Sequence, residues 1–188
     1  RDVSAWESEQ GGRVPWRVDD GAMTVVPGSK GIRTRQRFCD MQLHVEWRSP
    51  SATAGFEGQD RGNSGIFLQE LYELQVLDSY NNPTYANGQA GSIYKQAMPL
   101  VNASRKPGEW QAYDIIWKAP RFSQGGGLTS PARITVLHNG VLVQDDTVLA
   151  GRTEYIGAPS YAPHDCAPIS LQEHDSAVSY RNIWVREL

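Results

Sequence analysis

Short runs in which apolar and polar residues alternate constrain the fold of this chain more than any other feature. The runs occupy residues 21–26, 41–48, 64–69, 72–78, 110–119, 132–146, 168–174 and 180–188. Period-two alternation is typical of strands with one buried face, and turn-forming residues separate the runs. No segment has the pattern of a long amphipathic helix, and nothing repeats at a fixed period. The pattern therefore predicts an all-β fold, a β-sandwich or jelly roll.

Turn and loop signals divide the runs. Asn139-Gly140 lies between two alternating runs and favours a two-residue hairpin turn. Four segments rich in Gly, Ser, Pro and Asn are expected to be surface loops: 50–62, 80–92, 121–131 and 151–166. Loops of this length in a compact domain often carry function.

Length and composition limit the classes of function. The 188 residues fit one domain, 1–188, and the 39% hydrophobic and 21% charged residues are ordinary for a globular protein. The net charge of -3 provides no basic field for nucleic acid, which we therefore do not expect as a partner. No apolar run approaches the ~20 residues of a membrane helix. The sequence opens at Arg1 without Met or a signal peptide, as in a trimmed or mature product.

The chain has two cysteines, Cys39 and Cys166. Their separation matches neither a zinc knuckle nor a closely spaced redox pair. A disulfide and two free thiols both stay open, because pairing cannot be read from sequence.

Three predicted strands carry long hydrogen-bonding side chains on one face. These are His44, Glu46 and Arg48 in 41–48, Glu73 and Gln75 in 72–78, and Ser170, Gln172 and His174 in 168–174. If the strands are neighbours in one sheet, they form one polar face with two Glu and two His. The alternative is a solvated outer face, which antiparallel sheets commonly have and which needs no function.

Two kinds of site are compatible with such a face. Imidazole and carboxylate together suit zinc, manganese or iron, and the available ligands are His44, Glu46, Glu73 and His174. The stretch "ELQVLD" also resembles the acidic strand of laminarinase-type glycoside hydrolases, with Gln75 at the position of the middle Asp. Glu73 and Asp78 would lie roughly 16 Å apart on opposite faces of a straight strand, whereas a retaining pair needs about 5 Å.

Several other polar and aromatic residues are expected to be structural. Trp47, Trp117 and Trp184 alternate within strands and are expected in the core. His138, at a strand end, is expected to be exposed. Trp110 could stack on a sugar or pack against the protein, and Asp78 could orient the following loop or bind a structural cation.

Six segments together resemble the 3-keto-disaccharide hydrolase family. They are "WRVDDGAMTVVPG", "LHVEWRSP", "RGNSGIFLQELYELQVLDSY", "LVNASRKPGEWQAYDIIWKAPRF", "PARITVLHNGVLVQDD" and "PISLQEHDSAVSYRNIWVREL", in collinear order over nearly the whole chain. The chain departs from the family by starting after its usual opening Phe-x-Gly turn and by its 151–166 loop. The resemblance implies a concanavalin- or laminin-G-like jelly-roll β-sandwich of two antiparallel sheets. It also implies a periplasmic or secreted protein of bacteria that oxidise sugars at carbon 3 before cleaving them.

The implied reaction starts from a ketone at carbon 3, which acidifies the hydrogen on carbon 2. A general base removes that hydrogen, the enolate expels the substituent on carbon 1, and addition of water completes a net hydrolysis. The site then needs a base, a polarising group at the carbonyl oxygen and an acid for the leaving group.

Residues of the predicted polar face can supply these roles. Candidates for base and acid are Glu73, Glu46 and His174, and His44 or a divalent metal ion could polarise the carbonyl. Candidates for binding sugar hydroxyls are Arg48, Gln75, Gln172 and, at the rim, Asn63. We expect a saccharide substrate and no organic cofactor.

A carbohydrate-binding module without catalysis is the alternative function, because fold alone does not decide between the two. Aromatic, amide and hydroxyl groups suffice for binding. The two Glu and two His favour catalysis.

Overall fold

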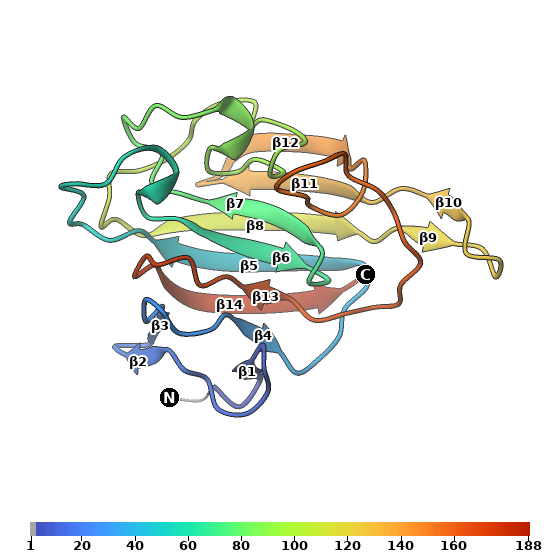
Figure 1. Cartoon of the computed structure of the whole chain (residues 1–188), viewed down its shortest axis with the longest axis horizontal. Coiled ribbons are helices and arrows are strands. Elements are labelled where there is room, and N and C mark those ends of the chain that lie inside the picture. Colours follow the sequence, from blue (N-terminus) through green and yellow to red (C-terminus); the bar gives the residue numbers. More distant parts are fainter. Residues whose placement is uncertain (1–2) are drawn as a thin grey trace.

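The computed structural model describes residues 3–188. The chain forms a jelly-roll β-sandwich of two antiparallel sheets (Figure 1). Arg1, where the sequence opens, lies outside the described residues. The larger sheet is ordered β12-β11-β8-β5-β14-β3-β2. Its strands are β2 (Arg17–Asp19), β3 (Ala22–Thr24), β5 (Met41–Arg48), β8 (Gln111–Lys118), β11 (Arg133–His138), β12 (Val141–Val148) and β14 (Ser179–Glu187).

The smaller sheet is ordered β1-β4-β13-β6-β7. Its strands are β1 (Trp6–Ser8), β4 (Ile32–Thr34), β6 (Ser64–Leu68), β7 (Tyr72–Val76) and β13 (Ser170–Leu171). A separate hairpin joins β9 (Arg121–Phe122) to β10 (Leu128–Ser130), and the 3-10 helices η1 (Gly58–Asp60) and η2 (Ala86–Gly88) lie in loops. Within residues 3–188, no helix has the length and apolar character needed to cross a membrane.

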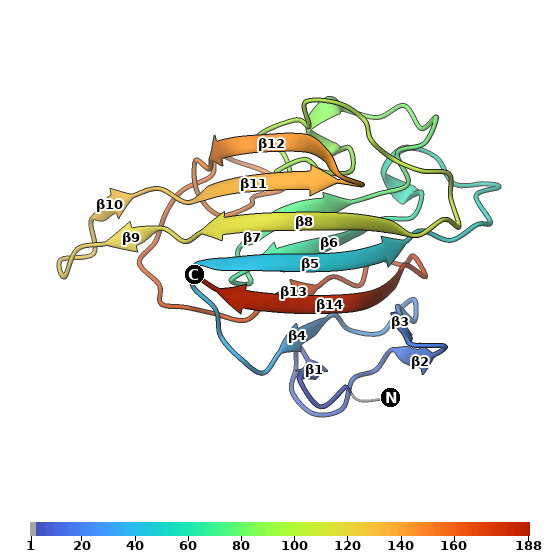
Figure 2. The ribbon, with the colours of Figure 1, turned by 180° about the vertical axis from the view of Figure 1, so that it is seen from behind.

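The core lies between the sheets, as the alternating runs predict. In β5, Leu43 and Val45 are fully buried, while His44 between them is partly exposed. In β7, Leu74 and Val76 point into the same core. The alternate side chains therefore face outward, His44, Glu46 and Arg48 in β5 and Glu73 and Gln75 in β7, on opposite sides of the sandwich. Figure 1 looks onto the smaller sheet and Figure 2 onto the larger one.

The hairpin turn at Asn139-Gly140 is confirmed. His138 pairs with Val141 across it, and both turn residues have positive φ, 53° and 81°. This geometry matches the strand twist in a two-residue hairpin, which explains the Asn-Gly pair. The predicted strand over 168–174 is much shorter in the structure, because the Glu173 carboxylate accepts from the Asp175 N–H and closes a turn.

Two burial predictions are wrong. His138 is buried, because it continues the inward-facing positions of β11, and its Nε2 lies 2.8 Å from Gln111 Oε1. Trp184 is 44% exposed, because the pairing register of β14 with β5 shifts between Arg181 and Trp184. Trp47 and Trp117 are buried, as expected.

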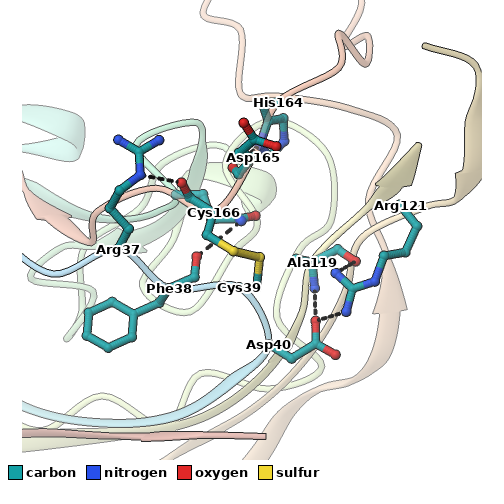
Figure 3. Close-up of a disulfide and its surroundings, with 10 residues drawn as sticks. Arg37, Phe38, Cys39, Asp40, Ala119, Arg121, His164, Asp165 and Cys166 are labelled. Carbon is teal, nitrogen blue, oxygen red and sulfur yellow. Dashed lines mark hydrogen bonds and ion pairs between the residues drawn. A yellow bond between two sulfur atoms is a disulfide. The ribbon is translucent and has the colours of Figure 1, made fainter. Parts of the chain in front are cut away.

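The two cysteines form a disulfide that links residues 127 positions apart in sequence. Figure 3 shows the bond between Cys39, just before β5, and Cys166, at the end of the 151–166 loop. Arg37 Nε donates to the Cys166 carbonyl at 2.7 Å, and Phe38 pairs with Ala167 through backbone hydrogen bonds. The end of a long loop is thereby fixed to the strand framework.

Strand β7 lies at the edge of the smaller sheet, and loops cover its free side. The Gln75 N–H donates to the Ser92 carbonyl, and the Tyr94 N–H donates to the Glu73 carbonyl. On the same strand, the Glu73 N–H donates to Thr153 Oγ1 at 2.9 Å. Two distant loop segments thus satisfy the edge backbone and bring their side chains beside those of β7.

Candidate active site

A cavity of about 520 Å³ lies over the outward-facing side chains of β6 and β7. Strands, η1 and the loops described above form its walls. It is lined by Gln59, Asp60, Asn63, Phe67, Glu73, Gln75, Tyr85, Tyr94, Thr153, Tyr155, Gln172 and His174. This volume lies in the range of small-molecule sites, and the lining combines aromatic and hydrogen-bonding groups.

Glu73 is the buried carboxyl group of this cavity. The side chain has no hydrogen-bond or ion-pair partner within residues 3–188, and the residue is 6% exposed. Burial without a compensating partner raises the pKa of Glu73 to about 8. The group can therefore change protonation state near neutral pH, as an acid or base catalyst must.

Gly65 leaves the space that the Glu73 carboxyl occupies. A Cβ on Gly65 would lie 2.6 Å from Glu73 Oε1 and 2.9 Å from Phe67 Cε2. Gly65 and Phe67 both belong to β6, which pairs with β7. The absence of a side chain at position 65 therefore determines where the carboxyl can lie.

Amide side chains form the second polar part of the cavity. Gln75 Nε2 donates to Gln59 Oε1 at 3.1 Å and to Asn63 Oδ1 at 3.3 Å, and Asn63 Nδ2 donates to the Gln59 carbonyl. The Oε1 atoms of Gln75 and Gln172 are buried and have no partner within the described chain. Such atoms are costly to leave unpaired, so both are suited to accept hydrogen bonds from a ligand.

Two groups at the exposed side of the cavity can also exchange protons. His174 and Asp60 line it and are both solvent-exposed. Asp60 belongs to η1, and His174 lies shortly after β13. The cavity therefore combines a desolvated carboxyl inside with an imidazole and a second carboxylate near solvent.

Three tyrosines from loops were not identified from the sequence. The Tyr85 and Tyr94 hydroxyls lie 2.7 Å apart, and Lys95 Nζ lies 5.1 Å from the centroid of the Tyr85 ring and 4.8 Å from that of Tyr155. Tyr155 is 70% exposed, so much of its ring can still contact a ligand beside Lys95. The loops of Tyr85 and Tyr155 were predicted, whereas Tyr94 lies beyond the predicted 80–92 loop. A tyrosine within a long polar loop was the available signal.

Five of the sequence-predicted site residues line the cavity. These are Glu73, His174, Asn63, Gln75 and Gln172. The predicted grouping with His44, Glu46 and Arg48 is wrong, because these three belong to β5 and face outward from the larger sheet. Ser170 is also separate from the cavity lining and is buried in β13.

The outward residues of β5 interact with their own sheet. His44 Nδ1 lies 2.7 Å from Asp114 Oδ1, and Glu46 accepts from Arg181 Nε at 2.5 Å. Burial works to raise the pKa of Glu46, but hydrogen bonds from Asn182 and Arg181 outweigh it and hold the pKa below its ordinary value. The Arg181 guanidinium also lies 4.0 Å from the centroid of Trp110, which packs against the protein. These contacts give Glu46 a structural role on the far side of the sandwich.

The predicted metal set does not come together. Two of its members, His44 and Glu46, lie on one side of the sandwich, and Glu73 and His174 lie on the other. Within residues 3–188, no three His, Cys, Asp or Glu side chains are grouped closely enough to hold a metal ion. The four residues that the sequence suggested as ligands therefore do not form one metal site within the described part of the chain.

The second carboxylate considered from the sequence, Asp78, also lies away from the cavity. It is 1% exposed, and its Oδ2 is 2.9 Å from Arg61 Nε. Its Oδ1 accepts from the Tyr80 N–H, so Asp78 orients the loop after β7. A charge-paired Asp78 is not positioned as the partner carboxylate of Glu73.

Comparisons with known proteins agree with this architecture. A family model described as 3-keto-alpha-glucoside-1,2-lyase-like domain matches residues 1–186. A crystal structure of a candidate glycosyl hydrolase from Parabacteroides distasonis shares 55% identity with a TM-score of 0.95, covering 100% of this chain and 80% of that one. Among curated proteins, no match was found.

Two further candidate glycosyl hydrolases from Parabacteroides distasonis share the fold. One is 18% identical with a TM-score of 0.71, covering 100% of this chain and 90% of the other. The second is 20% identical with a TM-score of 0.62, covering 97% and 99%. Because the family model spans nearly the whole sequence, the chain belongs to the family of 3-keto-alpha-glucoside-1,2-lyase-like domains, a membership that supports a carbohydrate-active enzyme.

Proposed function

We propose that this protein cleaves 3-keto-glycosides by removing the proton on carbon 2 and eliminating the substituent on carbon 1. The observation that supports the proposal most directly is Glu73, a desolvated carboxyl with a pKa of about 8 inside a sugar-sized cavity. The family description names a lyase acting on a 3-keto-alpha-glucoside, which agrees with such chemistry. Carbon 2 of that sugar carries an acidic hydrogen because the ketone is adjacent to it.

Glu73 is the general base in this mechanism. Its ionised carboxylate takes the proton from carbon 2, and the electrons of the broken bond move onto the ketone oxygen as an enolate. Burial makes this carboxylate a stronger base than an exposed glutamate, and a pKa near the working pH suits proton transfer. The enolate then forms the double bond between carbons 1 and 2 and expels the oxygen on carbon 1.

His174 is the proposed acid for the leaving group. An imidazolium can protonate the departing oxygen, and an exposed position allows exchange of the proton with solvent. The unpaired amide oxygens of Gln75 and Gln172 accept hydrogen bonds from sugar hydroxyls, which orients the ring. The product is an enone, and addition of water at carbon 1 returns a 3-keto sugar.

The test uses methyl 3-keto-α-glucoside and its unoxidised parent, with methanol release and enone absorbance as readouts. We expect release from the keto sugar alone. Glu73→Gln should lower kcat by about 100-fold or more, because a positioned base contributes about that much. Glu46→Gln is the matched control, since Glu46 lies on the far side of the sandwich, and it should retain activity.

The pH dependence of kcat/KM provides a second readout. With 4-nitrophenyl 3-keto-α-glucoside, whose leaving group departs without an acid, activity should rise with pH up to about 8 and then level off if Glu73 acts as the base. Equal cleavage of the parent glycoside would instead indicate ordinary hydrolysis. Saccharide binding without release from either compound would favour the binding-module alternative.

We also propose a periplasmic or secreted location. The Cys39–Cys166 disulfide supports it, because structural disulfides persist mainly in oxidising compartments. Fractionation of the source cells, with detection of the oxidised protein, would test the location.

A further inference from the structure

A second cavity, of about 220 Å³, adjoins the candidate active site. Asp60 lines both cavities. Two chain segments run from one cavity to the other: residues 59–63 contribute Asn63 to the first and Arg61 to the second, and the neighbours His174 and Asp175 line one cavity each. The two cavities therefore lie side by side, with Asp60 and His174 near their boundary.

The second cavity differs from the first in its chemistry. Its wall includes Pro27, Pro50, Ala52 and Phe56, of which Phe56 is 52% exposed. A hydrogen bond from the Phe56 N–H to the Thr53 carbonyl holds the local turn. An exposed aromatic ring in a largely apolar hollow is typical of a ligand contact.

Of the three charged side chains in this wall, Asp60 and Asp175 are exposed to solvent, and Arg61 is already engaged. Arg61 Nε lies 2.9 Å from Asp78 Oδ2, and its guanidinium also donates to the Tyr80 carbonyl. A second sugar would bring several hydroxyls against a wall whose surface is largely apolar, and polar groups buried there without partners are unfavourable. An aromatic group would bury Phe56 and the prolines without that penalty.

We infer that this second cavity binds the leaving group and selects an aromatic aglycone. The inference rests on the proposed function. The keto sugar occupies the first cavity, the aglycone contacts Phe56, and the bond that breaks lies where the cavities meet, beside Asp60 and His174. Phe56 is then a specificity-determining residue with no part in proton transfer.

The test compares two substrates, 4-nitrophenyl 3-keto-α-glucoside and methyl 3-keto-α-glucoside, by kcat/KM. Phe56→Ala should lower the value for the aromatic substrate by about 10- to 100-fold, because an aromatic contact is lost. The value for the methyl substrate should change by no more than about 2-fold, because a methyl group does not reach Phe56. Comparing each variant with wild type on the same substrate removes the intrinsic difference between the leaving groups.

Two additional variants make the test sharper. Leu100→Ala removes another exposed apolar side chain, 68% exposed and outside both cavities, and should affect neither substrate. Ala52→Asp places a charge in the second cavity at an exposed position and should selectively lower activity on the aromatic substrate. Since Ala52 is exposed, this variant tests the inference even if Phe56→Ala folds poorly.

The outcomes separate the two proposals. Wild type that cleaves neither keto substrate overturns the proposed function and, with it, this inference. Wild type that cleaves both, with Phe56→Ala and Ala52→Asp affecting both substrates equally or neither, overturns the inference alone. Selective loss of the aromatic substrate supports it.

Discussion

Replacing Glu73 with Gln should stabilise the folded protein at neutral pH while it abolishes the proposed catalysis. The native pKa of Glu73 is about 8, against an ordinary value of 4.5. Because the native value is the higher one, the folded state retains a proton that the unfolded state loses between these two pH values. Stability therefore falls as pH rises from about 4.5 to about 8.

The size of the effect follows from the same two values. At 1.36 kcal/mol per pKa unit, the carboxyl destabilises the fold by about 3 kcal/mol at pH 7 and by about 1 kcal/mol at pH 5. Gln has nearly the same shape and does not ionise. The stability of Glu73→Gln relative to wild type should therefore increase by about 2 kcal/mol between pH 5 and pH 7.

Urea unfolding of both proteins at several pH values, with intact disulfide, measures this difference. Glu46→Gln is a control with the opposite sign, since hydrogen bonds from Asn182 and Arg181 hold the pKa of Glu46 below its ordinary value. It should destabilise the protein at neutral pH and have less effect as pH falls. A Glu73→Gln difference that stays constant between pH 5 and pH 8 would refute the reasoning, because Glu73 would then titrate like an exposed group.

Three more predictions concern other parts of the fold. Burial, and to a smaller extent the charge of Arg105, lowers the pKa of His138 to about 4. NMR titration should therefore find a neutral ring at pH 5, and a titration midpoint above pH 6 would contradict this. Gly65→Ala should destabilise the protein by about 1–3 kcal/mol in urea unfolding, because the added Cβ displaces the Glu73 carboxyl. The same displacement should lower kcat/KM at least about 10-fold. Wild-type kinetics in this variant would show that the position of the carboxyl is unimportant. Replacing both Cys39 and Cys166 with Ala should destabilise the protein by about 3–5 kcal/mol through the long loop that they close, and an unchanged melting temperature would count against it.

Sequence alternation predicted the longer strands well because it reports a local property, the face to which each side chain points. It missed the short strands β1, β2 and β4, and the segment 121–131, predicted as a loop, contains β9 and β10. It identified the run at 41–48 with the bounds that β5 has in the structure. It could not reveal which sheet a strand joins, since pairing depends on partners far away in sequence. β5 pairs with β8 and β14, whereas β7 pairs with β6, and this separates Glu46 from Glu73.

Departures from regular strand geometry could not be predicted from the sequence either. The register shift in β14 moves Trp184 outward, and no single residue type in the sequence predicts such a shift. His138 follows the inward-facing pattern of β11, but its place beside a turn suggested exposure. The cavity aromatics Tyr85 and Tyr155 come from loops, whose paths depend on the backbone groups that they cover.

The covering of β7 has a consequence for how newly made chains avoid aggregating. All five residues of this edge strand are buried in the native state, and Thr153 and Ser92 cover its free backbone groups. Before these loop segments dock, the strand presents an unpaired, largely apolar edge to which another chain can add. Formation of the Cys39–Cys166 bond shortens the time for which the edge of β7 is exposed, because it holds the end of the 151–166 loop, which carries Thr153, near this strand. Oxidative conditions during folding should therefore increase the yield of soluble protein, apart from any effect on the finished enzyme.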